Sequence, residues 1–436
     1  MKTPIPHNIV RSVIEDINLP NFGKATIREI VTITNKIEKL TGERYIRMEM
    51  GVPGLEASAV GVKAEIAALQ AGVASKYPSL DGQHNLKQEA SRFIRAFIDT
   101  DIPAACCIPV VGSMQGTYAS YLTALQSNSS KDTVLFIDPG FPVQKQQLVV
   151  MGYKIESFDA FEYRGERLIK KIESFLKNGN IAAISYSNPN NPSWICLQES
   201  ELEGIGRLAT EYDCIVVEDL AYFGMDFRRD LSQPFKAPFQ VSVSQYTDNY
   251  IMLISSSKAF SYAGQRIGIA AISEELYYRY YGDLEARYTV GEFGNVFVNR
   301  VLYSLSAGTS HSAQYALAAM FKAASDGDFN FLGEVSEYAR RAEKVKEVFL
   351  KHGFEIVYLD DLGQPIGDGF YFTIRYPGMT GAALMEELMY YGISSISLET
   401  TGSLQEGLRI CTSFIQHDQY DDLEYRLACF AENHGN

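Results

Sequence analysis

The feature that most constrains the fold is a series of short apolar runs in the middle of the chain, separated by helical patterns. The runs are rich in Val and Ile, and several are apolar almost throughout, as are strands buried on both faces of a sheet. The candidates are TVLFID (133–138), YKIESF (153–158), IAAISYS (181–187), CIVVEDL (214–220), YIMLISSS (250–257) and IGIAAIS (267–273). Helical patterns lie between them, for example at 114–126 and 198–212. This alternation predicts an α/β fold with a mostly parallel sheet between helices.

The two ends of the chain differ from the middle. Residues 1–50 look mainly helical, and the last hundred residues begin with a charged amphipathic helix at 334–353. Four strand-like segments accompany these helices: RYIRMEM, FEIVYL, GFYFTIRY and GLRICTSF. We therefore expect a large domain over residues 51–325 and a smaller α+β domain built from both termini, residues 1–50 and 326–436.

Composition and charge exclude several classes of protein. The formal net charge is −14, from 39 basic and 53 acidic residues, which argues against binding to nucleic acid or to an anionic membrane surface. No segment has the roughly 20 apolar residues of a membrane span, and the N-terminus lacks a signal-peptide core. The six cysteines form no C-x-x-C pair, so we expect no metal site. Reduced thiols fit a cytoplasmic location.

Three polar residues lie at the ends of predicted strands. Asn191 follows one run, Asp219 closes the next and Lys258 follows a third. Ligands bind at the carboxyl edge of the strands in an open α/β sheet, so these residues are expected to meet in one crevice.

The surroundings of Lys258 suggest a cofactor. A partly buried lysine has a lowered pKa and attacks a carbonyl as a neutral amine, and pyridoxal phosphate is the aldehyde cofactor that this chemistry favours. Such a cofactor needs a carboxylate for its ring nitrogen, for which Asp219 is the candidate. Its phosphate needs an arginine, hydroxyls and free amides, which Arg266, Ser255 and the glycine turn at 110–120 can supply. We expect Gly264 to let the chain turn between Lys258 and Arg266.

Eight motifs, in order along the chain, make it resemble the class I/II aminotransferases, the fold-type I enzymes that use pyridoxal 5′-phosphate. They are MGVPG (50–54), YPSLDGQHNLKQEASRFI (77–94), VVGSMQG (110–116), DPGFP (138–142), NPNNPS (188–193), EDLAYF (218–223), SSSKAFSYAGQRIG (255–268) and GLRICTSF (407–414). The resemblance implies a seven-stranded, mostly parallel sheet in the large domain. It also implies a homodimer with a shared active site.

The resemblance assigns roles around the cofactor ring. Lys258 would bind the cofactor as a Schiff base and later carry a proton, and Asp219 would pair with the ring nitrogen. Tyr222 and Asn191 would hydrogen-bond the phenolic oxygen, with Asn191 also near the substrate, and Phe141 would stack on the ring. Lys258, Asp219 and Tyr222 are the expected catalytic residues.

The remaining assigned roles concern the phosphate and the substrate. The expected phosphate ligands are Ser113 and Met114 (through their backbone amides), Ser255, Ser257 and Arg266. Tyr77 would reach the phosphate from the neighbouring subunit. Arg409 would clamp the substrate carboxylate, close to Gly51.

The expected activity is transfer of an amino group between an L-amino acid and a 2-oxo acid, as part of amino acid metabolism and biosynthesis. A β-lyase or a decarboxylase on the same fold remains an alternative, and so does a cofactor-binding protein without catalysis. The sequence names no substrate: Arg287 and Arg300 are candidate cations for a dicarboxylic substrate, and the tyrosine-rich run 277–288 could line an aromatic pocket. The motifs also depart from the family pattern, most clearly at Trp194, where glycine is usual.

Overall fold

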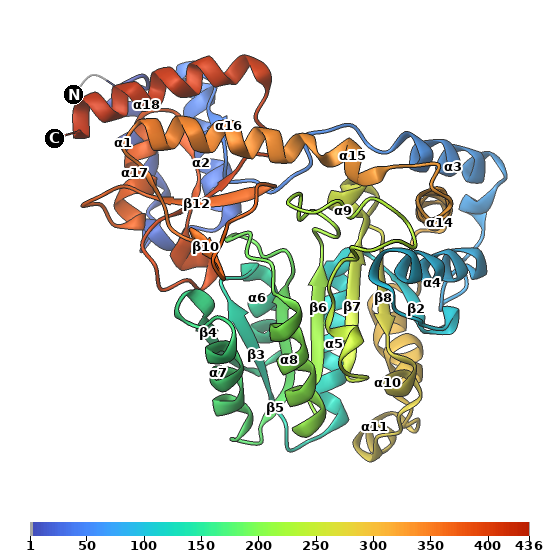
Figure 1. The fold of residues 1–436 in the computed structure, drawn as a ribbon. Coiled ribbons are helices and arrows are strands. Elements are labelled where there is room, and N and C mark those ends of the chain that lie inside the picture. Colours follow the sequence, from blue (N-terminus) through green and yellow to red (C-terminus); the bar gives the residue numbers. More distant parts are fainter. Residues whose placement is uncertain (1–2, 436) are drawn as a thin grey trace.

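The computed structural model describes residues 3–435 (Figure 1). Its main sheet has seven strands in the order β2-β8-β7-β6-β5-β3-β4. Their bounds are β2 Cys107–Val110, β3 Thr133–Asp138, β4 Lys154–Asp159, β5 Ile181–Ser187, β6 Ile215–Leu220, β7 Tyr250–Ser255 and β8 Gly268–Ile272. β8 is antiparallel to both of its neighbours, and the other pairs are parallel. The expected mostly parallel, seven-stranded sheet is confirmed.

Alternate residues of the inner strands are buried in different cores on the two faces of the sheet, whereas the edge strand β4 is largely exposed. On β6, Val216 belongs to one core and Val217 to the other. This is why the strands read as continuous apolar runs instead of alternating with polar residues. Only β2 lies outside the six predicted runs. It is an edge strand of four residues that contains Pro109, which an edge position tolerates.

Helices cover both faces of this sheet (Figure 1). One face packs against α4 His84–Ile98, α7 Glu166–Leu176, α8 Glu199–Glu211 and α14 His311–Asp326. The other face packs against α5 Gly112–Ser127, α6 Pro142–Met151, α10 Glu274–Tyr278, α11 Gly282–Tyr288 and α12 Phe293–Val296. Further helices are α3 Ala59–Gln70, α9 Ser256–Ala259, α13 Tyr303–Ser306 and α15 Phe331–Val335.

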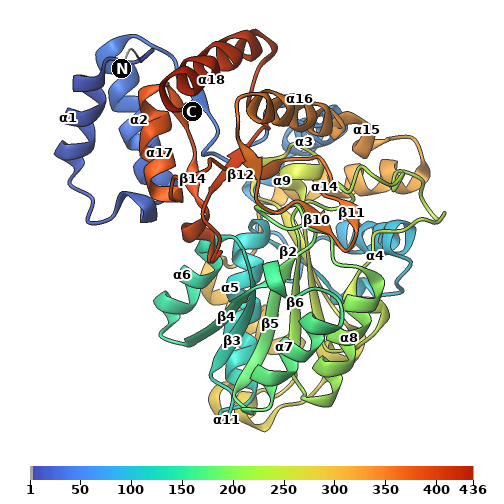
Figure 2. The ribbon, with the colours of Figure 1, turned by 60° about the vertical axis from the view of Figure 1, so that its left-hand side comes forward.

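A second lobe combines both ends of the chain. Its antiparallel sheet has the order β14-β15-β12-β9, and β1 pairs in parallel with β13. Its strands are β1 Ile46–Arg47, β9 Glu355–Ile356, β12 Tyr371–Arg375, β13 Ile393–Ser394, β14 Ile396–Ser397 and β15 Leu408–Cys411. Its helices are α1 His7–Ile17, α2 Ile27–Thr41, α16 Glu337–Lys351, α17 Gly381–Tyr390 and α18 Tyr420–His434. Figure 2 shows α1 and α2 beside α17, far apart in sequence but in contact in the fold.

The second lobe has its own hydrophobic core. The core draws residues from 5 to 48 and from 345 to 430. A short hairpin, β10 Asp360–Asp361 and β11 Gln364–Pro365, extends from this lobe toward the large one. We propose the domain limits 1–50 and 326–436 for the small domain and 51–325 for the large domain, a division that the separate core supports.

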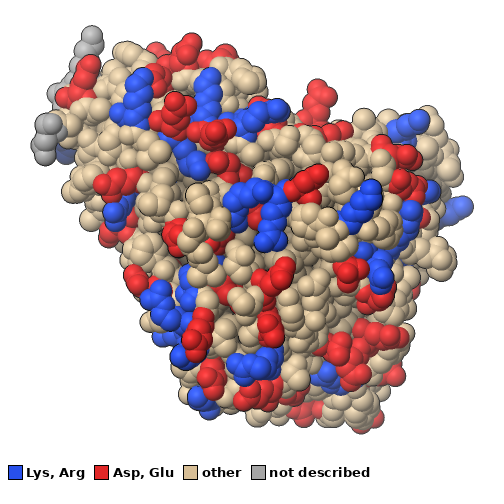
Figure 3. Space-filling model, viewed as in Figure 1, with Lys and Arg blue, Asp and Glu red and all other residues tan. Residues whose placement is uncertain are grey.

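Two surface properties bear on binding partners. Within residues 3–435 no helix has the length and apolar character that crossing a membrane requires. On the face drawn in Figure 3, Lys and Arg are interspersed with Asp and Glu, and they form no continuous basic surface there.

Candidate active site

A cavity of about 720 Å³ lies where the two lobes meet the carboxyl edge of the main sheet. This volume is within the usual range for small-molecule sites. Twelve of the thirteen site residues expected from the sequence line it: Gly51, Ser113, Met114, Phe141, Asn191, Asp219, Tyr222, Ser255, Ser257, Lys258, Arg266 and Arg409. They come from the glycine turn after β1, the carboxyl ends of five strands of the large sheet, the segment just before β8, and β15.

Strand register explains why the polar residues meet. Ser187 at the end of β5 is paired with Asp219 on β6, and Asp219 is paired with Leu253 on β7. The chain then turns into α9, which carries Lys258. Parallel neighbours end at the same edge, so Asn191, Asp219 and Lys258 converge as expected.

The Lys258 amine loses its proton more readily than an ordinary lysine. Its Nζ donates a hydrogen bond to the carbonyl oxygen of Gly51 and lies 5.0 Å from the centre of the Phe370 ring. Burial lowers the pKa of Lys258 to about 8, and the guanidinium groups of Arg409 and Arg266 contribute in the same direction. With this pKa about a tenth of the amines are neutral at pH 7, far more than for an ordinary lysine, and the neutral form can act as a nucleophile or a base.

Asp219 is a buried carboxylate with two donors. The backbone N–H of Ala221 donates to Oδ1 at 3.1 Å, and Nε2 of Gln144 donates to Oδ2 at 2.8 Å. Burial raises the pKa of Asp219 to about 6, while the two hydrogen bonds favour the ionised form. At neutral pH the group is mostly ionised and able to pair with a cation placed in the cavity.

The N-terminus of α5 and Arg266 lie next to each other and form an anion-binding corner. Ser113 and Met114 are in the first turn of α5, where backbone N–H groups have no partner within the helix. Gly112 has φ +66°, and a Cβ there would be 2.5 Å from Nη2 of Arg266. The glycine is therefore required for the guanidinium to approach the helix end. The Arg266 side chain also donates to Ser257 Oγ at 3.5 Å.

Arg409 is almost fully buried on the small-lobe side of the cavity, with 1% of its surface exposed. It donates to the carbonyl oxygen of Glu49, and its guanidinium lies 4.8 Å from the centre of the Tyr371 ring. Tyr222 donates a 2.9 Å hydrogen bond to the hydroxyl of Tyr371, so these residues form one contiguous group.

Several buried polar atoms in this region have no partner within residues 3–435. They include Ser113 Oγ, Asn191 Oδ1 and Arg409 Nε, all on side chains that line the cavity. Because burying such atoms without a hydrogen bond costs about 1–3 kcal/mol each, their presence together indicates a polar ligand. A donor at Arg409 suits a carboxylate.

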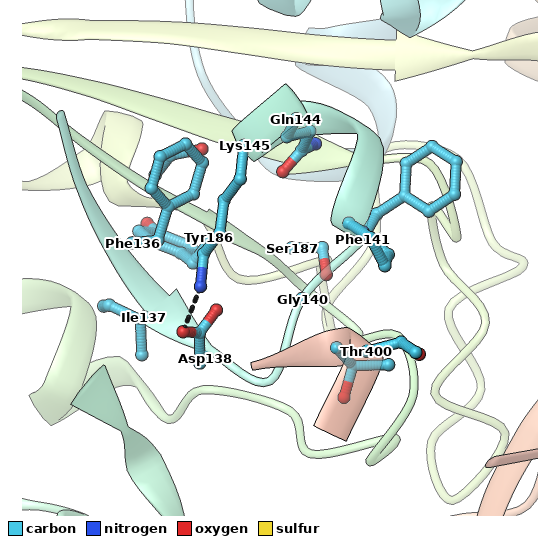
Figure 4. A pocket seen from close by; sticks show the side chains of 13 residues that line it. Phe136, Ile137, Asp138, Gly140, Phe141, Gln144, Lys145, Tyr186, Ser187 and Thr400 are labelled. Carbon is cyan, nitrogen blue, oxygen red and sulfur yellow. Dashed lines mark hydrogen bonds and ion pairs between the residues drawn. The ribbon is translucent and has the colours of Figure 1, made fainter. Parts of the chain in front are cut away.

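A small side pocket of about 20 Å³ adjoins the cavity, enough for roughly one water molecule (Figure 4). Phe141 and Gln144 line both spaces. In the side pocket Lys145 donates to the buried carboxylate of Asp138, the last residue of β3. This ion pair fixes the start of α6, from which Phe141 and Gln144 extend into the site.

Some sequence expectations do not place residues in this cavity. Tyr77 has 93% of its surface exposed and lines a separate surface pocket, so its role in a neighbouring subunit stays a prediction. Arg287 lines another surface pocket, and Arg300 donates to the carbonyl of Asn299; neither lines the cavity of its own chain. The expectation for Gly264 is wrong: Ser261 and Arg266 adopt the positive φ angles of this turn instead.

Other cavity residues were not anticipated. Gln144 donates a hydrogen bond to Asp219, and Tyr371 accepts one from Tyr222. One face of α2 also lines the cavity, through Ile27, Arg28, Val31 and Thr32. Gln144 could have been found from its place three residues after Phe141 at a helix start. Nothing in the sequence of α2 points to the cavity, because its position depends on packing between the two ends of the chain.

Comparison with known proteins agrees with this geometry. Residues 44–424 match the family model "Aminotransferase class I and II". The chain is 24% identical over 256 residues to a probable aspartate aminotransferase of Methanocaldococcus jannaschii, covering 59% of this chain and 62% of that protein. It is 27% identical over 195 residues to a glutamate–pyruvate aminotransferase of Escherichia coli, covering 44% and 45%. The matches thus span less than two thirds of either relative.

The fold also matches a solved structure over nearly its whole length. An aminotransferase from Mycobacterium tuberculosis superposes with a TM-score of 0.75 at 15% identity, covering 96% of this chain and 98% of that one. The cofactor of this family is pyridoxal 5′-phosphate. The family model covers most of the sequence, and the site has the lysine, carboxylate and arginines on which the resemblance rested. The chain belongs to the class I and II aminotransferase family.

Proposed function

We propose that this protein is an aminotransferase that moves an amino group between an L-amino acid and a 2-oxo acid. The observation that carries the proposal is the convergence of Lys258, Asp219 and Arg409 on one cavity, although they lie on three separate elements. An amine, a carboxylate and a carboxylate-binding guanidinium are the groups that this reaction requires from the protein.

The residues of the cavity fit pyridoxal 5′-phosphate. The first turn of α5, Arg266, Ser255 and Ser257 would hold the phosphate, and the unpartnered Ser113 Oγ supplies a further hydrogen-bonding group there. Asp219 would face the ring nitrogen, Asn191 and Tyr222 the phenolic oxygen, and Phe141 the ring. When bound, the cofactor supplies an aldehyde that condenses with amines and a ring that withdraws electrons from the substrate Cα.

The protein's own groups then hold the substrate and move protons. Arg409 binds the substrate carboxylate and so fixes which Cα bond is presented to the reaction. Lys258, whose pKa burial lowers to about 8, would take the proton from Cα and return one to the former aldehyde carbon across the imine nitrogen. Asp219, ionised at neutral pH, would favour a protonated ring nitrogen and so the electron-withdrawing form of the ring.

We further propose a homodimer whose second subunit contributes Tyr77. Exposed apolar side chains gather on neighbouring elements: Val62, Ile66 and Leu69 on α3, Tyr303 and Leu305 on α13, and Tyr315 on α14. Leu69 and Tyr77 line one surface pocket together with the start of α14. Exposed apolar surface of this kind marks interfaces. A cytoplasmic location, also proposed, is supported by six cysteines that form no disulfide.

Trapping of the cofactor on a lysine tests the assignment of Lys258. After reduction with borohydride and digestion, the modified peptide should carry the cofactor on Lys258, and Lys258→Ala should carry none. Lys170→Ala is the matched control, because this lysine is 70% exposed on α7 and does not line the cavity. A Lys258→Ala protein that retains the same visible absorbance and the same labelled peptide would refute the assignment.

A further inference from the structure

The charge lining the cavity is strongly positive, although the whole chain carries −14. Four lining side chains are cationic, Arg28, Lys258, Arg266 and Arg409, and only Asp219 is acidic. The proposed function gives Lys258 to the cofactor aldehyde, Arg266 to the phosphate and Arg409 to the substrate carboxylate. Arg28 has no role in that scheme.

The Arg28 side chain is exposed, and within residues 3–435 it makes no ion pair and no hydrogen bond. Both acids of α2 are occupied. Glu29 accepts hydrogen bonds from Thr26 in the capping box, and Glu38 binds the backbone N–H of Tyr45 and the side chain of Arg47. Nearby acids are paired as well: Glu399 with Lys24, and Asp16 with Lys36. No described acid neutralises Arg28.

Arg28 lies on the side of the cavity formed by α2. It lies in the first turn of α2, and Ile27, Val31 and Thr32 of the same helix line the cavity beside it. Arg409 is placed on β15 of the small lobe and Lys258 on α9 of the large lobe. Arg28, Ile27 and Val31 line the same cavity as Arg409, so a ligand whose carboxylate binds Arg409 shares that space with this face of α2.

We propose that Arg28 selects substrates with an anionic group, carboxylate or phosphate, at the end of the side chain. This inference rests on the proposed function of the same site. A guanidinium binds either anion in a bidentate pair, while a neutral side chain leaves it without a partner and a cationic one is repelled. The methylene groups of the ligand pack against the apolar residues of α2.

Calorimetric binding to the cofactor-loaded protein tests the proposal without turnover. The probes are glutarate and 3-phosphonopropanoate, which carry a second anionic group, and pentanoate, which does not. Wild-type protein should bind at least one of the dianionic probes about 10-fold more tightly than pentanoate. A difference of this size is expected from one charge-assisted hydrogen-bonded pair that is partly exposed to solvent. Arg28→Gln should lose the preference for dianionic probes, while its affinity for pentanoate should change less than about 2-fold. Arg28→Lys should retain part of the preference for dianionic probes.

Three control variants keep the test specific. Lys39→Gln removes an exposed cation from the last turn of the same helix and should retain the preference. Arg287→Gln and Arg300→Gln test whether either arginine supplies the charge from a second subunit. No preference in the wild type, an unchanged preference in Arg28→Gln, or its loss in Arg287→Gln or Arg300→Gln would overturn the proposal.

A turnover comparison separates this inference from the proposed function. Glutamate and glutamine have side chains of similar shape, and Arg28→Gln should lower the ratio of their kcat/KM values about 10-fold. If wild-type protein transaminates neutral amino acids and the ratio does not change, the inference fails and the proposed function stands. If no amino acid is transaminated, the proposed function fails.

Discussion

At the scale of single residues, the protonation state of Lys258 governs how the cofactor attaches. Burial lowers the pKa of the amine from 10.5 to about 8, and only the neutral amine attacks an aldehyde. In cofactor-free protein the rate of attachment should rise about tenfold per pH unit below pH 8 and level off above it. The appearance of the visible absorbance band between pH 6 and 10 measures this. A midpoint near 10.5 would show that the amine is not desolvated.

Asp219 affects a later step than Lys258. Asp219→Asn removes the negative charge but keeps a side chain of the same size beside Gln144, so the cofactor should still attach to Lys258. The half-reaction with an amino acid should slow by on the order of 10²–10³-fold, the usual cost of removing one electrostatic stabiliser. Stopped-flow absorbance measures both steps. Equal rates for variant and wild type would show that the carboxylate does not serve the reaction.

At the scale of elements, Trp194 joins the NPNNPS loop to the small lobe. It is fully buried, its ring lies 5.3 Å from that of Tyr222 and 6.3 Å from that of Tyr371, and it packs against Gly367 and Gly369. The bulky residue that breaks the family motif thus fills the space behind the Tyr222–Tyr371 hydrogen bond, where glycines 367 and 369 make room for it.

Removal of the Trp194 ring should therefore weaken both the fold and the tyrosine pair. Trp194→Ala should lower the free energy of unfolding by about 3–5 kcal/mol, and Trp194→Phe by less, because it retains part of the packing. Urea unfolding measures this, and a pH titration of the bound cofactor's absorbance should shift if Tyr222 moves. An Ala variant as stable as wild type would refute the packing role.

A buried ion-pair network attaches the β10–β11 hairpin to the large lobe. Asp361 is fully buried, with Arg164 at 2.7 Å and Arg228 at 2.9 Å, and Arg164 also pairs with Glu201. Asp361→Asn should cost about 3–5 kcal/mol, because two mostly buried guanidinium groups lose part of their compensation. The control is Glu166→Gln, which removes an 81% exposed carboxylate from an ion pair with Lys170 on the surface and is expected to change stability far less. Equal losses in the two variants would contradict this account.

Most elements could be predicted from their sequence pattern. Strands β3 and β5 match the predicted ranges, and β4, β6, β7 and β8 differ by one or two residues at their ends. The strands were predictable because burial on both faces leaves a continuous apolar run. β2 lies in the apolar run AACCIPVV (104–111) and was missed because Pro109 within the run argues against a strand.

At the scale of the whole molecule, the site residues that could not be predicted from the sequence are those that tertiary packing brings to the cavity. Twelve expected residues line the cavity because motifs and strand ends identify them. The contributions of α2 and Tyr371 depend on how the two termini fold against each other, and no local pattern encodes that. Trp194 could be recognised in the sequence as a departure from the family motif, but its contacts with Tyr371 and Gly369 could not be predicted.

The proposed dimer gives a further prediction at this scale. Sedimentation should show a dimer, and Tyr77→Phe should weaken cofactor binding about 10-fold through loss of one hydrogen bond to a charged group, with the dimer retained. Tyr303→Phe, on the exposed surface of α13, is the control and should leave cofactor affinity unchanged. A monomer that binds cofactor and turns over at full rate would refute the role given to Tyr77.

The central claim is that this site transfers amino groups. The most direct measurement adds each of the twenty L-amino acids to the cofactor-loaded protein and follows conversion of the bound aldehyde to its amine form, with identification of the released 2-oxo acid. The account predicts that at least one amino acid gives both products in equal amounts, and that a 2-oxo acid restores the aldehyde form. Release of ammonia or carbon dioxide in place of a stoichiometric 2-oxo acid and amine form would contradict it.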